Sequence, residues 1–308
     1  SDVPAKTGLG SSSSFLVSLL HMISILKNLV GFLRIKLTLN KYILLKEKMK
    51  FNKELINYNK FSNHLFTVDA DWAPDFMIKE ISNIFLDNNI PATFFVTHKS
   101  EYLKDLSTDK NFEIGIHFYK FAYKDENTQK KHDQELTNFY HEICNFYNTY
   151  ITSNRFHRLQ YSYRDLEFLK KLGIKNDLST LLFSQQNIEP HYNILYDIVQ
   201  LPYFFEDGIC ENIGHNFYSN IDIFSKGMKI FNFHPLNIYI NSSDKKHREN
   251  FLFNISNLVK VKKSFASGFI NKETFGSCDF LKELIQKYKK RKLNFFKVDD
   301  YRRKLYEK

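Results

Sequence analysis

The stretch LFTVDADW at residues 65–72 ends an apolar run on two acidic residues, Asp69 and Asp71. Alternate residues of a β-strand face the same side of a sheet, so a strand here would carry both carboxylates to one edge. A second apolar run, EIGIHF at residues 113–118, ends near His117. Carboxylates and an imidazole at one sheet edge could bind a metal ion or transfer a proton. We therefore expect the functional site where these two strands end.

Apolar runs of strand length alternate with segments of helical periodicity from residue 63 onward. The strand predictions are residues 65–71, 91–98, 112–118, 194–205 and 228–240, and the helix predictions are residues 75–89, 128–150 and 165–174. Asp75 is expected to cap the first of these helices. Repeated strand and helix units favour a parallel sheet or an α/β barrel, with active residues at the carboxyl ends of the strands.

The composition indicates a globular protein with no nucleic-acid partner. With 308 residues and 43% hydrophobic content, the chain is long enough to bury a large core. Its net charge of +10 comes from lysines spread over the whole chain, and no motif that reads DNA or RNA occurs. A charged or sugar-phosphate substrate is compatible with this charge.

The cysteines and the apolar segments favour a cytoplasmic protein. Three cysteines lie far apart with no CxxC pair, which argues against a disulfide framework and against a thiolate zinc site. The apolar stretch at residues 15–39 is interrupted by Lys27, Arg34 and Lys36, so we expect no stable membrane span. A helix lying in the membrane interface is the alternative interpretation of that stretch.

Residues 3–20, VPAKTGLGSSSSFLVSLL, have the glycine and serine pattern of a phosphate-binding turn before a helix. Residues 2–21 resemble the nucleotide-binding motif of the GHMP kinases, in particular those that act on heptose phosphates. Nothing after residue 21 continues such a kinase. Our hypothesis is that residues 1–48 are a kinase-like remnant and that the functional domain spans residues 49–308. A sugar kinase fragment stays open as an alternative.

Six motifs in order resemble the polysaccharide deacetylases of carbohydrate esterase family 4, which share NodB homology. They are TVDADW, PATFFVTH, EIGIHF, RFHRLQYS, LPYFFED and FNFHPLNIYIN, and the resemblance spans about residues 65–284. It is greatest to a divergent branch encoded with capsule or lipopolysaccharide genes. The resemblance implies an α/β fold, a distorted and incomplete (β/α) barrel.

The resemblance also implies a metal site that departs from the family pattern. In the family motif TFDDG the first aspartate is the general base and the second a metal ligand, which implies these roles for Asp69 and Asp71, although Ala70 separates them. In the motif HSxxH both histidines are ligands. His117 matches the first, but Phe121 stands in place of the second. We take His157 as the candidate replacement, which gives two imidazoles and a carboxylate for zinc or another divalent ion.

Two further roles follow from the resemblance, and two aromatic residues are candidates for sugar binding. Arg155 corresponds to the arginine that orients the base, and His234 to the histidine that acts as general acid. Metal-assisted hydrolysis of a sugar acetamide or acetyl ester is implied, with His234 protonating the departing amine or alkoxide. Trp72 and Tyr203 could offer apolar faces to sugar rings.

The expected function is removal of an acetyl group from a sugar during surface polysaccharide biosynthesis. The expected partner is a carbohydrate, free or linked to a nucleotide or lipid. A catalytically inactive deacetylase fold that binds glycans or scaffolds other enzymes is the alternative, because Phe121 replaces a family metal ligand.

Overall fold

The computed structural model describes residues 64–120, 125–212, 221–253 and 255–306. The kinase-like segment, the boundary at residues 48 and 49, and Phe121 lie outside the described residues. The proposed division of the chain into a remnant and a functional domain therefore stays a prediction.

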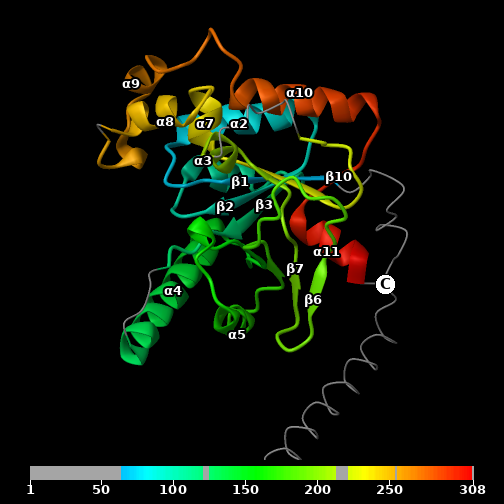
Figure 1. Cartoon of the computed structure of the whole chain (residues 1–308). Helices are drawn as coiled ribbons and strands as arrows, with labels where there is room; N and C mark the ends of the chain where they lie inside the picture. The colour runs from blue at the N-terminus through cyan, green and yellow to red at the C-terminus, as the bar shows by residue number, and fades with distance from the viewer. Residues whose placement is uncertain (1–63, 121–124, 213–220, 254, 307–308) are drawn as a thin grey trace, which may run out of the picture. The chain divides into compact units, whose positions relative to one another are not determined.

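The described residues form one curled sheet whose strands are parallel except for the last pair at one edge (Figure 1). The strand order is β6-β7-β5-β4-β3-β2-β1-β9-β8, and β10 pairs with the start of β1. The strands are β1 (His64–Asp69), β2 (Ala92–Val96), β3 (Phe112–Ile116), β4 (Ser153–Asn154), β5 (Asn176–Asp177), β6 (His191–Asn193), β7 (Ile198–Gln200), β8 (Phe205–Glu206), β9 (Lys229–Phe233) and β10 (Phe295–Phe296). This open, curled sheet confirms the predicted incomplete (β/α) barrel.

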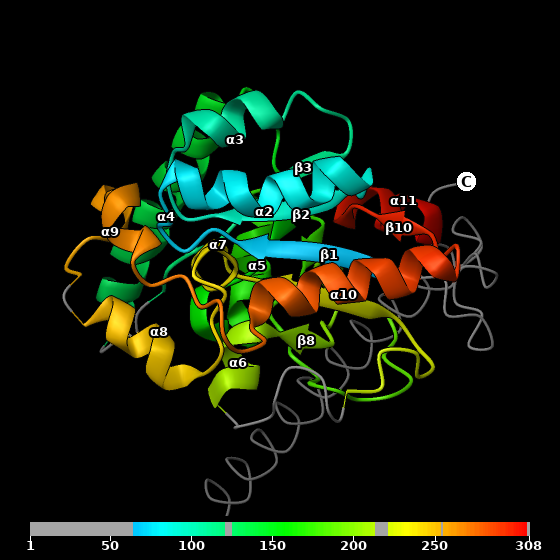
Figure 2. The same ribbon diagram turned by 90° about the horizontal axis from the view of Figure 1, so that it is seen from above.

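Helices cover the outer face of the sheet, and α2 and α10 run side by side along β1 (Figure 2). The helices are α2 (Asp75–Asn88), α3 (Glu101–Leu106), α4 (Glu126–Tyr147), α5 (Tyr163–Lys171), α6 (Asp207–Asn212), α7 (Pro235–Tyr239), α8 (Lys245–Leu252), α9 (Lys263–Ser267), α10 (Ser277–Lys290) and α11 (Val298–Tyr306), with 3-10 turns η1 (His157–Leu159) and η2 (Leu258–Lys260). Each long β–α connection runs between parallel strands, as the alternating sequence pattern predicts.

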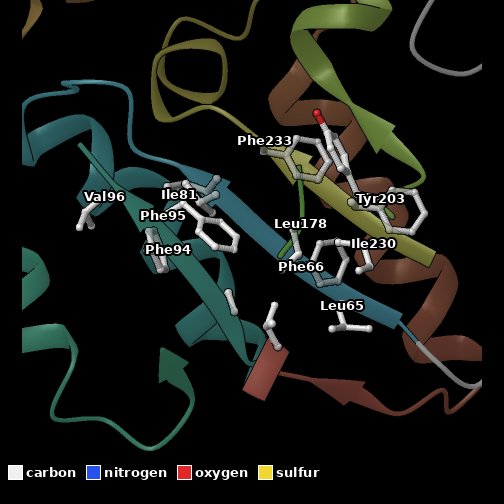
Figure 3. Close-up of a cluster of buried hydrophobic side chains, with 14 of the residues drawn as sticks. Leu65, Phe66, Ile81, Phe94, Phe95, Val96, Leu178, Tyr203, Ile230 and Phe233 are labelled. Carbon is white, nitrogen blue, oxygen red and sulfur yellow. The ribbon is translucent and has the colours of Figure 1, made fainter. Parts of the chain in front are cut away.

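Alternate side chains of β1 face opposite sides of the sheet. One side is the core covered by helices, and the other is the inside of the curled sheet. Phe66 packs on Phe85 of α2 with ring centroids 5.5 Å apart, and its ring also lies 6.4 Å from that of Phe233. The neighbouring Thr67 faces inward and donates a hydrogen bond of 2.9 Å to Asn232. Figure 3 shows buried side chains of β1, β2 and β9, among them Phe66 and Phe233. On β1, the apolar Phe66 therefore faces the core, whereas the polar Thr67 faces the interior that leads to the site.

Several predicted element boundaries were wrong. Asp75 is the first residue of α2 rather than its cap, and its carboxylate accepts a hydrogen bond of 2.5 Å from Ser100. The strand predicted at residues 228–240 ends at Phe233, because Pro235 begins α7. The strand predicted at residues 194–205 is only β7 and the start of β8. Pro202, which cannot donate to a strand ladder, lies between them.

A buried carboxylate joins the amino end of the barrel to α11. Glu113 of β3 accepts hydrogen bonds from the backbone N–H of Asp299 at 3.0 Å, from Thr93 at 3.1 Å and from Ser153 at 2.5 Å. Burial raises the pKa of Glu113, and these hydrogen bonds act in the opposite direction. The cluster ties α11 to β2, β3 and β4 at the amino ends of these strands.

Gly115 gives the first testable prediction, because no side chain fits at this position of β3. A Cβ there would lie 2.5 Å from the Phe95 ring and 3.1 Å from the carbonyl oxygen of Ser153. We expect Gly115→Ala to lower the free energy of unfolding by about 1–3 kcal/mol, measured by urea denaturation. In the control Gly268→Ala the new Cβ would come no closer than 3.4 Å to any atom, so stability should change by less than about 0.5 kcal/mol. Equal stability of both variants would contradict the packing of Phe95 against β3.

Candidate active site

The carboxyl ends of four parallel strands bring the predicted polar residues together. Asp69 is the last residue of β1, His117 follows β3, Arg155 follows β4 and His234 follows β9. In the sheet β4 is next to β3 and β1 is next to β9, and only β2 lies between these two pairs. The predicted polar residues therefore lie at the edge of the sheet where the active residues of α/β proteins usually gather.

Asp69 is a buried carboxylate with a partner on each oxygen. Arg155 Nη1 donates to Oδ1 at 2.8 Å, and Asn232 Nδ2 donates to Oδ2 at 2.8 Å. Burial would raise the pKa of Asp69, but Arg155, His117 and His234 lower it below its usual value. Asp69 is therefore ionised at neutral pH and held in one orientation.

The guanidinium of Arg155 lies between two aromatic rings. Its Cζ is 4.7 Å from the centroid of Phe95 and 4.3 Å from the centroid of Tyr203. The Tyr203 hydroxyl donates a hydrogen bond to Glu206. The Tyr203 side chain is fully buried, so its ring contacts Arg155 rather than solvent in this structure.

Asp71, His117 and His157 form a cluster that could hold a metal ion, with one ligand atom from each lying within 4.8 Å of the others. Asp71 Oδ1 lies 3.2 Å from His117 Nε2 and 3.2 Å from His157 Nδ1, and these two nitrogens are 3.3 Å apart. His117 Nδ1 donates to the carbonyl oxygen of Arg155 at 2.7 Å, which directs Nε2 into the cluster. Two imidazole nitrogens and a carboxylate oxygen form a donor set that suits zinc and other divalent ions, so the residues fit such an ion.

Asp71 reaches this cluster from a turn rather than from a strand. The strand β1 ends at Asp69, and Asp71 has a φ of 37°, in the left-handed region. The expectation that both aspartates share a strand face is therefore wrong, although both carboxylates lie at the same site. Burial would raise the pKa of Asp71, but hydrogen bonds from His117 and His157 hold it well below its usual value. A deprotonated carboxylate is the form that binds a metal ion.

Trp72 lies beside the cluster of Asp71, His117 and His157. Its backbone N–H donates to Thr97 at 2.8 Å, and its ring lies edge-on to that of His157 with centroids 5.2 Å apart. The indole is half-buried and lines the same cavity as the cluster, where a sugar ring could contact it.

His234 is paired with a buried aspartate, Asp207, for which no role was predicted from the sequence. Its Nδ1 donates to Asp207 Oδ1 at 2.6 Å, its backbone N–H donates to Asp207 Oδ2 at 3.0 Å, and its Nε2 lies 3.5 Å from Asp71 Oδ2. Burial lowers the pKa of His234, but the charge of Asp207 and its hydrogen bond raise it well above the usual value. Protonated His234 therefore presents an Nε2–H toward Asp71, one of the three candidate metal ligands.

Asn232, the second partner of Asp69, was also missed. It lies two residues before His234 on β9, so both side chains face the interior, and this spacing was visible in the sequence. Asp207 offered a weaker signal. It stands in the motif LPYFFED, but its contact with His234 depends on the parallel pairing of β8 with β9.

An open cavity of about 890 Å³ lies over these side chains, within the usual range for ligand sites. Its lining includes all but one of the predicted site residues, namely Asp69, Asp71, Trp72, His117, His157, Tyr203 and His234. The exception is Arg155, which is fully buried behind Asp69. The structure therefore places the predicted site residues in or beside one cavity.

Comparison with protein families shows the family of this chain. The family model of WbmS-like polysaccharide deacetylases matches residues 66–251. The chain belongs to this family. No curated protein sequence matches the chain.

One solved structure supports the fold, and two others are less similar. A Bordetella bronchiseptica protein classified as a polysaccharide deacetylase involved in O-antigen biosynthesis is 21% identical, with a TM-score of 0.57, over 76% of this chain and 96% of that protein. A family 4 carbohydrate esterase from Bacillus anthracis is 17% identical, with a TM-score of 0.44, over 85% of this chain and 92% of the other. A pseudoenzyme of the same esterase family from Bacillus anthracis is 11% identical, with a TM-score of 0.42. The match covers 78% of this chain and 65% of the pseudoenzyme chain.

Among the described residues, no helix has both the length and the apolar character needed to cross a bilayer. The cytoplasmic location and the form of the carbohydrate substrate stay predictions.

Proposed function

We propose that this chain is a metal-dependent hydrolase that removes an acetyl group from a sugar. The observation that carries the proposal is the convergence of Asp71, His117 and His157 beside Asp69 and His234 in one cavity. Membership of the polysaccharide deacetylase family supports it. Zinc is our first choice of metal, because catalytic zinc sites commonly have three protein ligands of these types.

Asp69 and His234 each lie beside one of the three candidate metal ligands. Asp69 Oδ2 is 3.8 Å from His117 Nε2, and His234 Nε2 is 3.5 Å from Asp71 Oδ2. A bound divalent ion would acidify a water molecule and polarise the acetyl carbonyl. Asp69 takes a proton from the attacking water, since each of its oxygens retains a lone pair beside its hydrogen bond.

The departing group takes its proton from His234. The Nε2–H donates to the amine nitrogen or alkoxide oxygen as the bond to the acetyl carbon breaks. The charge of Asp207 stabilises the imidazolium before this transfer and keeps Nδ1 protonated throughout. Asn232 and Arg155 fix the orientation of Asp69 and keep its pKa low.

Acetate release tests the proposed function. The protein is loaded with zinc and incubated with N-acetylated and O-acetylated sugars, in free and nucleotide-linked forms, and acetate is measured by an enzyme-coupled assay. Release that depends on the metal is the expected result. A metal-loaded protein that releases no acetate from any of them would favour the inactive, glycan-binding alternative, which Phe121 suggested in the sequence.

The Asp207 and His234 pair predicts the pH dependence of this activity. Because Asp207 raises the pKa of His234, the acid form persists at neutral pH, and activity declines only when the pH rises above that pKa. Asp207→Asn removes the charge, so this decline should begin at lower pH, by about one unit or more. The pH profile of kcat/KM measures the shift, with the exposed Asp87→Asn as the matched control. An unchanged alkaline limb would contradict the role of Asp207.

A further inference from the structure

One wall of the cavity carries an arginine that the proposed reaction does not use. Arg248 of α8 lines the same cavity as Asp69 and His234, next to Gly208 of α6. A Cβ added at Gly208 would lie 3.0 Å from Arg248 Nη1 and 3.8 Å from His234 Cε1. The guanidinium and the proposed general acid therefore flank the same small space.

A buried carboxylate forms an ion pair with Arg248, without a hydrogen bond between them. Arg248 Nε lies 3.2 Å from Glu211 Oε2, and the exposed fractions of the two side chains are 22% and 0%. Burial and the neighbouring charge of Asp207 raise the pKa of Glu211 to about 7, so its carboxylate neutralises the guanidinium only in part. Within the described part of the chain, no hydrogen bond is made by either Nη group. The Nη groups of the Arg248 guanidinium are therefore available to a ligand in the cavity.

Asn237 of α7 provides a second, independent observation in this cavity. Its side chain is 1% exposed and lines the cavity, yet neither its amide nitrogen nor its amide oxygen has a hydrogen-bond partner among the described residues. Buried polar groups in folded proteins are almost always satisfied, so an exception beside a cavity marks a position where a water molecule or a ligand group binds. An amide nitrogen donates to the same oxygen acceptors that a guanidinium binds.

The other acids of this wall have partners. Asp207 pairs with His234, and Glu206 accepts the hydrogen bond of the Tyr203 hydroxyl. Burial raises the pKa of Glu206, which favours its neutral form. A second arginine, the exposed Arg158, also lines the cavity. The cavity can therefore accept a negatively charged ligand group without facing an unpaired acid on this wall.

We propose that Arg248 binds an anionic group of the substrate, either a carboxylate on the sugar or a phosphate attached to it, and that Asn237 donates to the substrate from the same cavity. The inference rests on the proposed function, because the anionic group belongs to the sugar whose acetyl group is removed. A guanidinium suits this task, since its planar fork can donate two parallel hydrogen bonds to two oxygens of one carboxylate or phosphate.

Three probes separate the two sources of the anion. N-acetylglucosamine is neutral, N-acetylglucosamine 1-phosphate carries a phosphate, and 2-acetamido-2-deoxyglucuronic acid carries a carboxylate. Binding of each to the zinc-loaded full chain is measured by calorimetry, and acetate release from each is measured in parallel. We expect at least one anionic probe to bind about 10- to 100-fold more tightly than the neutral sugar, the contribution of a hydrogen bond to a charged group.

The variant Arg248→Gln tests whether this residue carries the preference. The ratio of affinities between the anionic and the neutral probe should fall toward one. In the control Arg164→Gln, at an exposed position of α5, the ratio should not change. Because Arg248→Gln leaves Glu211 buried without its partner, the double variant Arg248→Gln with Glu211→Gln replaces it if the single variant does not fold.

The outcomes distinguish this inference from the proposed function. Equal affinity for neutral and anionic probes, or a preference that survives in the folded variant, would overturn the role of Arg248 even if acetate is released. Binding of an anionic probe that depends on Arg248 in a chain that releases no acetate would support the subsite and overturn the hydrolase assignment.

Discussion

Replacing Asp69 by Asn is expected to lower kcat/KM for acetate release by about 10³-fold, within the range of general-base catalysis. The amide is close to the carboxylate in size but cannot take a proton from water at neutral pH. Asp69 lies outside the group Asp71, His117 and His157, so the variant should still bind metal. Acetate release and metal content, measured on the same preparation, separate the loss of a base from the loss of an ion.

The matched control for this prediction is Asp87→Asn, at an exposed position of α2. It should leave both acetate release and metal content unchanged. Because Asp69 neutralises the buried Arg155, the melting temperature of the Asp69→Asn variant is measured as well, and the activity of the folded fraction is compared. Turnover equal to that of the wild type would refute the base role.

Replacing His117 by Ala is expected to abolish both metal binding and acetate release. His117 Nε2 points at Asp71 and His157, and its Nδ1 is fixed by the carbonyl oxygen of Arg155. Without this imidazole only two ligands remain, which is fewer than catalytic zinc sites use. We expect a loss in kcat/KM of about 10³-fold or more, because the ion supplies several kcal/mol of transition-state stabilisation.

A chelation experiment separates this effect from misfolding. Wild-type protein stripped with a chelator should lose activity and regain it on addition of zinc, whereas the His117→Ala variant should stay inactive at the same zinc concentration. The exposed His141→Ala serves as the control and should behave as the wild type. A His117→Ala variant that keeps its activity would show that the reaction does not use this cluster.

Local patterns in the sequence were sufficient for the central strands β1, β2, β3 and β9, but β4, β5, β6 and β10 were not predicted. The apolar runs that end at Asp69, His117 and His234 are strands with neighbouring carboxyl ends, and this geometry follows from the parallel sheet itself. The same reasoning failed for Asp71, because strand alternation holds only while the strand continues and β1 ends at Asp69.

The partners of the site residues were harder to predict because their contacts are non-local. Asp207 lies 27 residues before His234, and only the pairing of β8 with β9 brings the two together. Asn232 was the exception, since it precedes His234 by two residues and the backbone stays extended through His234, one residue beyond β9. A search for polar residues at this spacing would have found it.

The proposed function depends on the cluster of Asp71, His117 and His157, and His157 is its least expected member. It follows Phe156 after β4 rather than lying one helical turn beyond His117, where Phe121 stands in the sequence. Its Nδ1 is nonetheless 3.2 Å from Asp71 and 3.3 Å from His117 Nε2. The structure thus brings a histidine from a different segment to the metal cluster.

Metal content is the measurement that tests this claim most directly. Wild-type protein, His157→Ala and His141→Ala are incubated with zinc and dialysed, and the ions are counted by mass spectrometry. We expect about one zinc ion per chain for the wild type and for His141→Ala, and far less than one for His157→Ala. A wild-type protein without bound metal, or a His157→Ala variant with full occupancy, would contradict this claim.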